Sequence, residues 1–111
     1  MEGSGMAHVI ITMMSGSEDG KMFKPDKMPI TIGRHPNDDV YLPNDKQISR
    51  HHARISKDGD SYFIEDVGSQ SKGSTNGTYV DIAKIIEKTP ITSGQIFTLG
   101  NIWLRFDVID K

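Results

Sequence analysis

Apolar residues recur at every second position in short runs along the chain. The clearest run is residues 102–108, where Ile102, Leu104, Phe106 and Val108 alternate with other side chains. Successive side chains of a strand point to opposite faces of a sheet, so this period predicts strands that bury one face. Residues such as Gly, Pro and Asp, which favour turns, close the runs. About eleven short strands are expected, in or near residues 9–13, 22–23, 28–32, 40–42, 53–56, 61–66, 79–80, 84–86, 88–91, 95–99 and 102–108.

The turns, and the scarcity of helical patterns, indicate the fold class. Asp58-Gly59-Asp60 is a hairpin signal between two of the runs. Only residues 81–88 have a composition compatible with a helix, and that length is marginal for one. Short strands at frequent turns predict an all-β protein, a sandwich of mostly antiparallel strands in two sheets. Trp103 has the opposite register to Leu104, which places it on the outer face or under a loop.

The length of 111 residues suits one domain. Residues 1–7 are expected to form a flexible leader, because the first five are rich in Gly and Ser and resemble an artificial addition. The domain itself is expected at residues 8–108, with a tail at 109–111.

Composition excludes several classes of protein. The chain has no Cys, which excludes a disulfide scaffold and thiolate chemistry and favours a reducing compartment. No apolar run approaches the roughly 18 residues of a membrane span, and the N-terminus lacks a signal-peptide pattern. The sequence therefore predicts an intracellular protein, cytoplasmic or nuclear. Its net charge of −2 gives no support for binding to nucleic acid.

The distribution of charge is more informative than its sum. Residues 46–57 carry four cations and two His but no acid, and residues 67–78 are acid-free and rich in hydroxyls. All 15 acids lie elsewhere. A third polar fragment, Gly33-Arg34-His35, ends a predicted strand. Loops without acids in an acidic protein predict a local anion site.

A phosphate monoester fits these residue types. It carries close to two negative charges and three acceptor oxygens. The guanidinium of Arg34 offers a planar fork to such an anion, and hydroxyls and backbone N–H groups can satisfy the remaining lone pairs. Gly33 is expected to let the chain turn so that Arg34 points over the loops. The Asn76-Gly77 turn offers an amide that can hold the main chain of a ligand.

Other chemistries fit these residues less well. His51 and His52 are adjacent and point to opposite faces, so the expected role of His52 is a hydrogen bond that braces the loop of Ser49, and not metal binding. Ser49 lacks the Gly-x-Ser-x-Gly context of a hydrolase nucleophile, and the glycines of residues 68–77 lack the ending of a P-loop. Asp38-Asp39 is interpreted as a solvated turn before a strand. We therefore expect no catalytic residue, no metal and no cofactor.

Three motifs, taken in order, resemble the forkhead-associated (FHA) domain family. They are Gly33-Arg34, Ser49-Arg50-His51-His52 and Thr75-Asn76-Gly77-Thr78. The segments around them and the later Gly94-Gln95-Ile96 are also similar to that family, so the resemblance covers about residues 8–108. It implies a β-sandwich of about eleven strands whose loops at one end bind phosphothreonine peptides.

The resemblance also implies roles for individual residues. It assigns the phosphate to Arg34, Ser49 and Arg50, the phosphothreonine residue to Thr75, and the peptide backbone to Asn76. The residues expected to shape the loops are Gly33, His52 and Gly77. The residues expected to affect specificity are Gln47 and Ser74.

The sequence therefore predicts a non-enzymatic module that is monomeric in isolation and binds phosphothreonine-containing partners, the products of a Ser/Thr kinase. Direct contact with nucleic acid or a membrane is not expected. The alternative is a phospho-independent scaffold that docks or dimerises through a sheet face. The complete set Arg34, Ser49, Thr75 and Asn76 favours the binding module, because a scaffold does not need all four.

Overall fold

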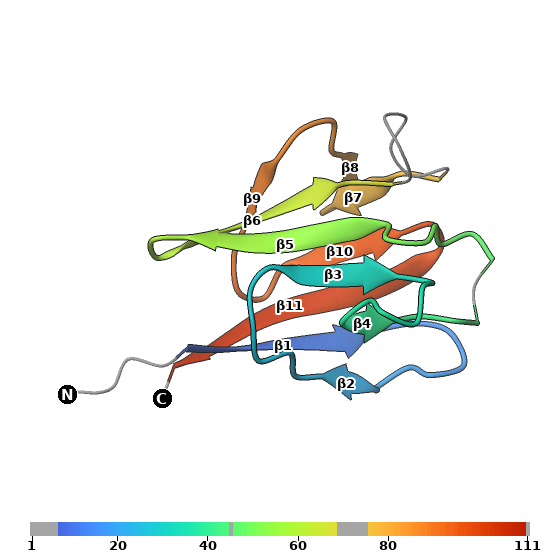
Figure 1. Ribbon diagram of the computed structural model, residues 1–111, viewed down its shortest axis with the longest axis horizontal. Helices are drawn as coiled ribbons and strands as arrows, with labels where there is room; N and C mark the ends of the chain where they lie inside the picture. Colours follow the sequence, from blue (N-terminus) through green and yellow to red (C-terminus); the bar gives the residue numbers. More distant parts are fainter. Residues whose placement is uncertain (1–6, 45, 69–75, 111) are drawn as a thin grey trace.

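The chain folds into two β-sheets that pack face to face (Figure 1). The computed structural model describes residues 7–44, 46–68 and 76–110. These ranges contain eleven strands and no helix. No helix in the described part of the chain is therefore long and apolar enough to cross a membrane. The predicted all-β sandwich is confirmed, and residues 81–88 do not form the alternative helix.

The two sheets have six and five strands. The six-stranded sheet has the order β2 (Met22–Phe23), β1 (Ala7–Met13), β11 (Ile102–Asp110), β10 (Ile96–Leu99), β7 (Thr78–Val80) and β8 (Ala83–Lys84). The five-stranded sheet has the order β4 (Val40–Tyr41), β3 (Ile30–Gly33), β5 (Ala53–Asp58), β6 (Ser61–Asp66) and β9 (Thr89–Ile91). Neighbouring strands are antiparallel except β3 and β4, which are parallel. The longest pair joins β1 to β11, with Ala7 opposite Asp110.

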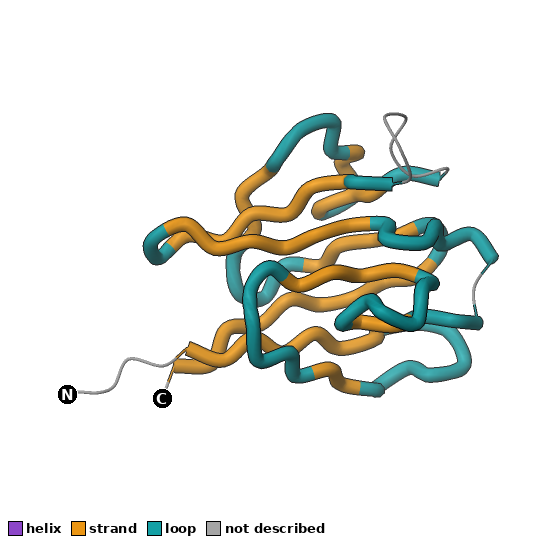
Figure 2. The backbone as a smooth tube through the Cα atoms, in the orientation of Figure 1, coloured by secondary structure: helices purple, strands orange, loops and turns teal. Residues whose placement is uncertain are grey.

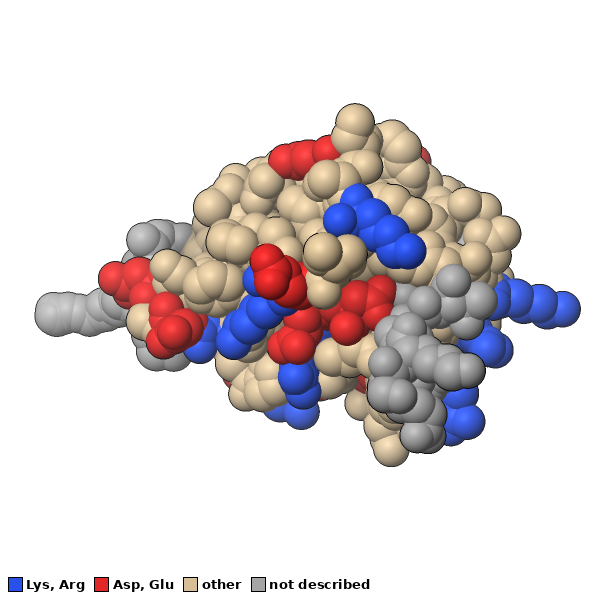
Figure 3. All heavy atoms as spheres, turned by 90° about the horizontal axis from the view of Figure 1, so that it is seen from above, with Lys and Arg blue, Asp and Glu red and all other residues tan. Residues whose placement is uncertain are grey.

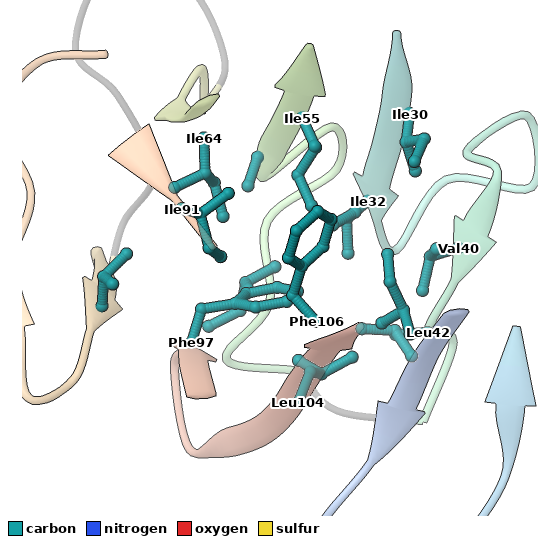
Figure 4. Close-up of a cluster of buried hydrophobic side chains, with 14 of the residues drawn as sticks. Ile30, Ile32, Val40, Leu42, Ile55, Ile64, Ile91, Phe97, Leu104 and Phe106 are labelled. Atoms are coloured by element: carbon teal, nitrogen blue, oxygen red, sulfur yellow. The ribbon is translucent and has the colours of Figure 1, made fainter. Parts of the chain in front are cut away.

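The core lies between the sheets and follows the period of two in the sequence. Leu104 and Phe106 of β11 are fully buried, whereas Trp103 is 51% exposed on the outer face. The register predicted for Trp103 is therefore correct. Figure 4 shows side chains from both sheets meeting in this core, among them Ile55, Ile64, Ile91, Phe97 and Phe106. Burial of this apolar surface is the main force that holds the two sheets together.

Some strand boundaries differ from the pattern. Strand β3 begins at Ile30, two residues after Met28, because Pro29 has no N–H to donate to a ladder. Leu42 lies just after β4, yet it is buried and its N–H donates to the carbonyl of Gly33 at 2.8 Å. Ile86 lies outside β8 and is 90% exposed.

The connections divide the sandwich into two ends (Figures 1 and 2). At one end lie the connection between β1 and β2 and the described parts of the connections between β3 and β4, β4 and β5, β6 and β7, and β10 and β11. We call the last four connections the loop end, and their described residues are 34–39, 42–44, 46–52, 67–68, 76–77 and 100–101. At the opposite end lies the β5–β6 hairpin, where Asp58 pairs with Ser61 as the hairpin signal predicts.

Candidate functional site

Hydrogen bonds between distant segments bring the predicted site residues together at the loop end. The N–H of Arg34 donates to the carbonyl of Ser49 at 3.1 Å, which joins the β3–β4 loop to the β4–β5 loop. Asn76 donates from Nδ2 to the carbonyl of Gln47 at 2.9 Å, which joins the β6–β7 segment to the same loop. Three segments that are far apart in the sequence therefore present one surface (Figure 1).

Arg34 is exposed but held in place by one of its nitrogens. Its Nε donates to the carbonyl of Ile48 at 2.9 Å. The structure gives its two terminal nitrogens no partner among the described residues. A guanidinium has five N–H donors in a planar fork. One donor therefore fixes the group, and the other four have no partner among the described residues.

Ser49 and Arg50 occupy the β4–β5 loop beside Arg34. Ser49 is half-buried, and both of its backbone groups form hydrogen bonds. Its carbonyl accepts from the N–H of Arg34, and its N–H donates to Nδ1 of His52 at 3.0 Å. Arg50 is exposed. Of the three residues predicted to bind the phosphate, Arg34 and Arg50 carry exposed cations. The third, Ser49, follows Ile48, whose carbonyl accepts from Arg34.

His52 is fully buried and links two loops. Because its Nδ1 accepts from Ser49, its Nε2 carries the proton and donates to the carbonyl of Gly77 at 2.8 Å. Burial lowers the pKa of His52 from its usual 6.5, while the Gly77 carbonyl and the charge of Asp66 act in the opposite direction. The ring is therefore neutral, and the hydrogen bond predicted between His52 and the loop of Ser49 is present.

Gly33 is required for space. A Cβ at this position would lie 2.5 Å from the backbone N of His51 and 2.8 Å from that of His52. Its φ is not in the left-handed region. The sequence predicts that glycine is needed here for a turn. The structure shows instead that glycine is needed because a side chain would not fit. Glycine at this position permits the end of β3 to touch the last residues of the β4–β5 loop, His51 and His52, and this contact accompanies the hydrogen bond between Arg34 and Ser49.

Asp38 is the functional-site residue that the sequence reasoning missed. It is 5% exposed, so the interpretation as a solvated turn is wrong. Its Oδ2 accepts from the N–H groups of His35 and His51 at 3.1 and 3.2 Å, and its Oδ1 lies 2.6 Å from Nδ1 of His51. The turn at residues 35–38 is visible in the sequence, but the partner His51 is 13 residues away. Only the tertiary structure shows this clamp between the β3–β4 and β4–β5 loops.

Asp39 and the two histidines near Asp38 also have defined partners. Asp39 is half-buried, and its Oδ2 accepts from the N–H and hydroxyl of Thr31 at 3.0 and 3.2 Å. His51 has a φ of 52°, and its ring stacks on that of His35 with centroids 4.6 Å apart. In the part of the chain that the structure describes, no group of three His, Cys, Asp or Glu side chains is arranged to hold a metal ion.

The β6–β7 segment completes the surface as far as it is described. Asn76 is exposed, and Gly77 follows with a φ of +81°, which glycine adopts without strain. Gln47 is exposed opposite Asn76. Ser74 and Thr75, for which the sequence predicts roles in specificity and in contact with phosphothreonine, lie outside the described residues.

The fold and the loop end define a class of protein: a β-sandwich that presents exposed cations, among them Arg34 and Arg50, on the loops at one end. A family model described as the FHA domain matches residues 30–100. The chain therefore belongs to the FHA domain family, and the family proposed from the three motifs is confirmed.

Several known proteins are similar to this chain. The oxoglutarate dehydrogenase inhibitor of Corynebacterium jeikeium is 36% identical over 106 residues, which cover 96% of this chain and 69% of that protein. The glycogen accumulation regulator GarA of Mycolicibacterium smegmatis is 29% identical over 106 residues, 96% of this chain and 63% of that protein. By their names, the first relative is an inhibitor and the second is a regulator. The chain thus spans about two thirds of the length of these two relatives.

Solved structures agree with this assignment. A structure described as an analysis of phosphothreonine-dependent FHA domain interactions is 27% identical, with a TM-score of 0.74, and the match covers 90% of this chain and 95% of that one.

Proposed function

We propose that the loop end binds phosphothreonine-containing peptides of protein partners. The observation that carries this proposal is the state of Arg34, whose Nε donates to the carbonyl of Ile48 and whose other guanidinium donors have no partner among the described residues. An exposed, pre-oriented guanidinium is suited to a doubly charged oxyanion, which it can contact through two parallel hydrogen bonds.

The neighbouring residues take complementary roles in this proposal. Ser49 donates its hydroxyl to a phosphate oxygen, and Arg50 adds a second cation. Asn76, across the surface, holds the peptide backbone, and Thr75 contacts the phosphothreonine residue. Gly33, His52 and Gly77 shape the loops through the contacts described above. Gln47, whose carbonyl accepts from Asn76, and Ser74 are proposed to affect the choice of residues that follow.

The comparisons support this proposal through the family. A related structure at 27% identity is described in terms of phosphothreonine-dependent interactions, and two relatives are named as an inhibitor and a regulator. We propose an intracellular module at residues 8–108, monomeric in isolation and without catalytic activity, metal or cofactor. Its partner is a protein phosphorylated by a Ser/Thr kinase. Because the surface is small, its affinity is expected to be on the order of micromolar.

The experiment is a titration with three forms of one peptide library, carrying phosphothreonine, phosphoserine or unmodified threonine. Fluorescence anisotropy should show binding that requires the phosphate and favours phosphothreonine. Arg34→Ala should weaken it by about 30-fold or more, the equivalent of about 2 kcal/mol for a charge-assisted contact. Arg105→Ala is the matched control, because it removes an arginine paired with Asp107 on the outer face of the six-stranded sheet. Binding that ignores the phosphate, or that survives Arg34→Ala, would contradict the proposal.

A phospho-independent scaffold is the competing function, and one observation favours keeping it in the test. Trp103 and Met22 belong to the six-stranded sheet and are 51% and 55% exposed. Free phosphothreonine separates the two functions. It should displace a partner from the loop end, whereas it should leave a partner docked on the sheet in place.

A further inference from the structure

Lysine and arginine side chains away from the loop end are mostly paired within the described part of the chain. Four of them have a carboxylate partner within 3.8 Å: Lys21, Lys27, Arg54 and Arg105. Two more lie over aromatic rings, Lys57 over Tyr62 and Lys88 over Phe63. Lys24 is the described exception in this region. Such pairing is what a protein with 15 acids and 13 cations should show.

The loop end and the strand beside it differ. Arg34, Arg50 and Lys84 are exposed, and none has a carboxylate partner among the described residues. Figure 3 shows Lys and Arg side chains that project at the right-hand end, where the loops lie, while the coloured Asp and Glu side chains gather toward the middle and the left. The proposed phosphate site uses Arg34 and Arg50. It does not use Lys84, which lies on β8.

Lys84 lies directly beside Gly77, which follows Asn76, the residue proposed to hold the peptide backbone. It pairs with Tyr79 across the β7–β8 ladder, and β7 begins one residue after Gly77. A Cβ placed on Gly77 would be 3.1 Å from Cε of Lys84 and 3.3 Å from Cε1 of Tyr79. The lysine stem therefore passes over Gly77, and its ammonium group is one bond further on. A peptide held by Asn76 must pass close to this charge.

Within the described part of the chain, Lys84 forms no ion pair with Glu87, three residues after it. Two other nearby acids have partners elsewhere. Asp81, in the β7–β8 turn, accepts from Nε2 of Gln95 at 2.7 Å. Asp66, at the end of β6, accepts from the hydroxyl of Thr78 at 2.8 Å. Thr78 is buried, so this bond lies on the inner face of β7, whereas Lys84 is exposed on the opposite side of the ladder. An exposed cation without a carboxylate partner next to a binding surface favours ligands that bring the carboxylate.

We propose that Lys84 is a specificity-determining residue that selects phosphothreonine peptides with an acidic side chain near the residue held by Asn76. This inference rests on the proposed function, and it narrows the ligand to an acidic phosphopeptide. An exposed Lys–carboxylate pair contributes about 0.2–1 kcal/mol, so one acid at the right position should tighten binding by about 1.5- to 5-fold. The gain should shrink as salt is added, because exposed charges are screened.

The test is anisotropy with a phosphothreonine peptide whose other positions are neutral, and with variants that carry one Glu at each position in turn. For the wild-type chain, one position should give the expected gain over the neutral peptide. Lys84→Met should bring the ratio of acidic to neutral affinity close to one. Lys84→Glu should reverse the preference, so that a Lys at that position binds more tightly than a Glu. Lys24→Met, which removes an exposed lysine far from the loop end, is the control and should keep the wild-type ratio.

Two failures can be told apart. If the neutral phosphothreonine peptide binds no better than its unphosphorylated form, the proposed function fails and this inference fails with it. If binding requires the phosphate but the ratio is the same in wild type, Lys84→Met and Lys84→Glu, the proposed function stands and the role of Lys84 is wrong.

Discussion

Gly33 and Gly59 lie at opposite ends of the sandwich, and the space around them differs. At the tip of the β5–β6 hairpin, Gly59 has a φ of +62° and no atom within 4 Å of an added Cβ. At the loop end, a Cβ on Gly33 would lie 2.5 Å from the backbone N of His51. At the hairpin, glycine permits a left-handed backbone conformation. At the loop end, it permits close contact between two segments. The hairpin end is held by turn geometry, whereas the loop end is held by long-range contacts.

The hydrogen bonds at the loop end repeat this difference. Arg34 bonds a carbonyl 14 residues away, His52 one 25 residues away, and Asn76 one 29 residues away. In the hairpin, Asp58 faces Ser61 across a turn of two residues. A change in one loop should therefore alter the other loops of the site, while a change in the hairpin should remain local. Four predictions test this comparison.

The largest effect is expected from His52→Ala. The substitution removes a buried ring and its two hydrogen bonds between loops, so the free energy of unfolding should fall by about 3 kcal/mol. Urea denaturation measures this loss, and His8→Ala, which alters an exposed histidine on β1, should change it by less than about 0.5 kcal/mol. If His52→Ala does not fold, His52→Asn provides the measurement, because its amide can retain the acceptor for Ser49. Equal stability of the His52 and His8 variants would contradict long-range bracing.

The pair Gly33→Ala and Gly59→Ala compares the two ends directly. Gly33→Ala forces backbone atoms apart and should lower the free energy of unfolding by about 2 kcal/mol. It should also weaken phosphopeptide binding, because Arg34 moves with the end of β3. Gly59→Ala places an alanine in the left-handed region and should cost about 1 kcal/mol, with no effect on binding. Calorimetry and peptide titration on the same samples check both values. If Gly33→Ala binds the phosphopeptide as tightly as the wild-type chain, binding does not depend on the close contact at Gly33.

Asp38 permits a graded test of the clamp between the β3–β4 and β4–β5 loops. Asp38→Ala removes the acceptor of two backbone N–H groups and of the His51 ring, so a loss of about 2 kcal/mol is expected. Asp38→Asn should lose only about 1 kcal/mol, because the amide oxygen can accept from both N–H groups while His51 changes tautomer. Thermal unfolding ranks the variants. The same rank in phosphopeptide affinity is expected, and an affinity independent of Asp38 would show that the clamp is not needed for binding.

The smallest effect is the dependence of stability on pH. The pKa of His52 is lowered in the folded chain, so below pH 6.5 the unfolded chain takes up a proton that the folded chain resists. Its contribution is complete above pH 6.5 and is lost as the pH falls toward and through the folded pKa, by at most about 1.4 kcal/mol per pH unit. The difference in unfolding free energy between wild type and His52→Asn, followed from pH 8 downward, isolates this contribution. A constant difference would mean that His52 does not titrate in this range.

The strands could be predicted from the sequence because their signal is local. The alternation at Leu104 and Phe106 and the turn at Gly59 are both properties of neighbouring residues. The three motifs located the loop end, because their order along the chain matches the family. The hydrogen bond of His52 could also be inferred, since Ser49 lies within the same short loop. In each case, the partners are close in the sequence or the family supplies the correspondence.

The rest could not be predicted because it depends on packing between distant segments. Asp is a residue type common in turns, and nothing near Asp38 in the sequence shows that its carboxylate contacts His51. The crowding around Gly33 has the same origin, and a local argument about turns could not show it. The position of Lys84 beside Gly77 depends on the β7–β8 register. A pattern of charges along the chain does not show which cations have partners.

The pairing of Ala7 with Asp110 has a practical consequence for handling the domain. The start of β1 and the end of β11 lie side by side, at the end opposite the loops (Figure 1). A purification tag, a tether to a sensor surface or a neighbouring domain joined there is attached at the end opposite the loops and leaves the proposed binding surface open. The same arrangement allows the domain to be inserted into an exposed loop of a host protein. The two points of insertion need to be only as far apart as two adjacent strands.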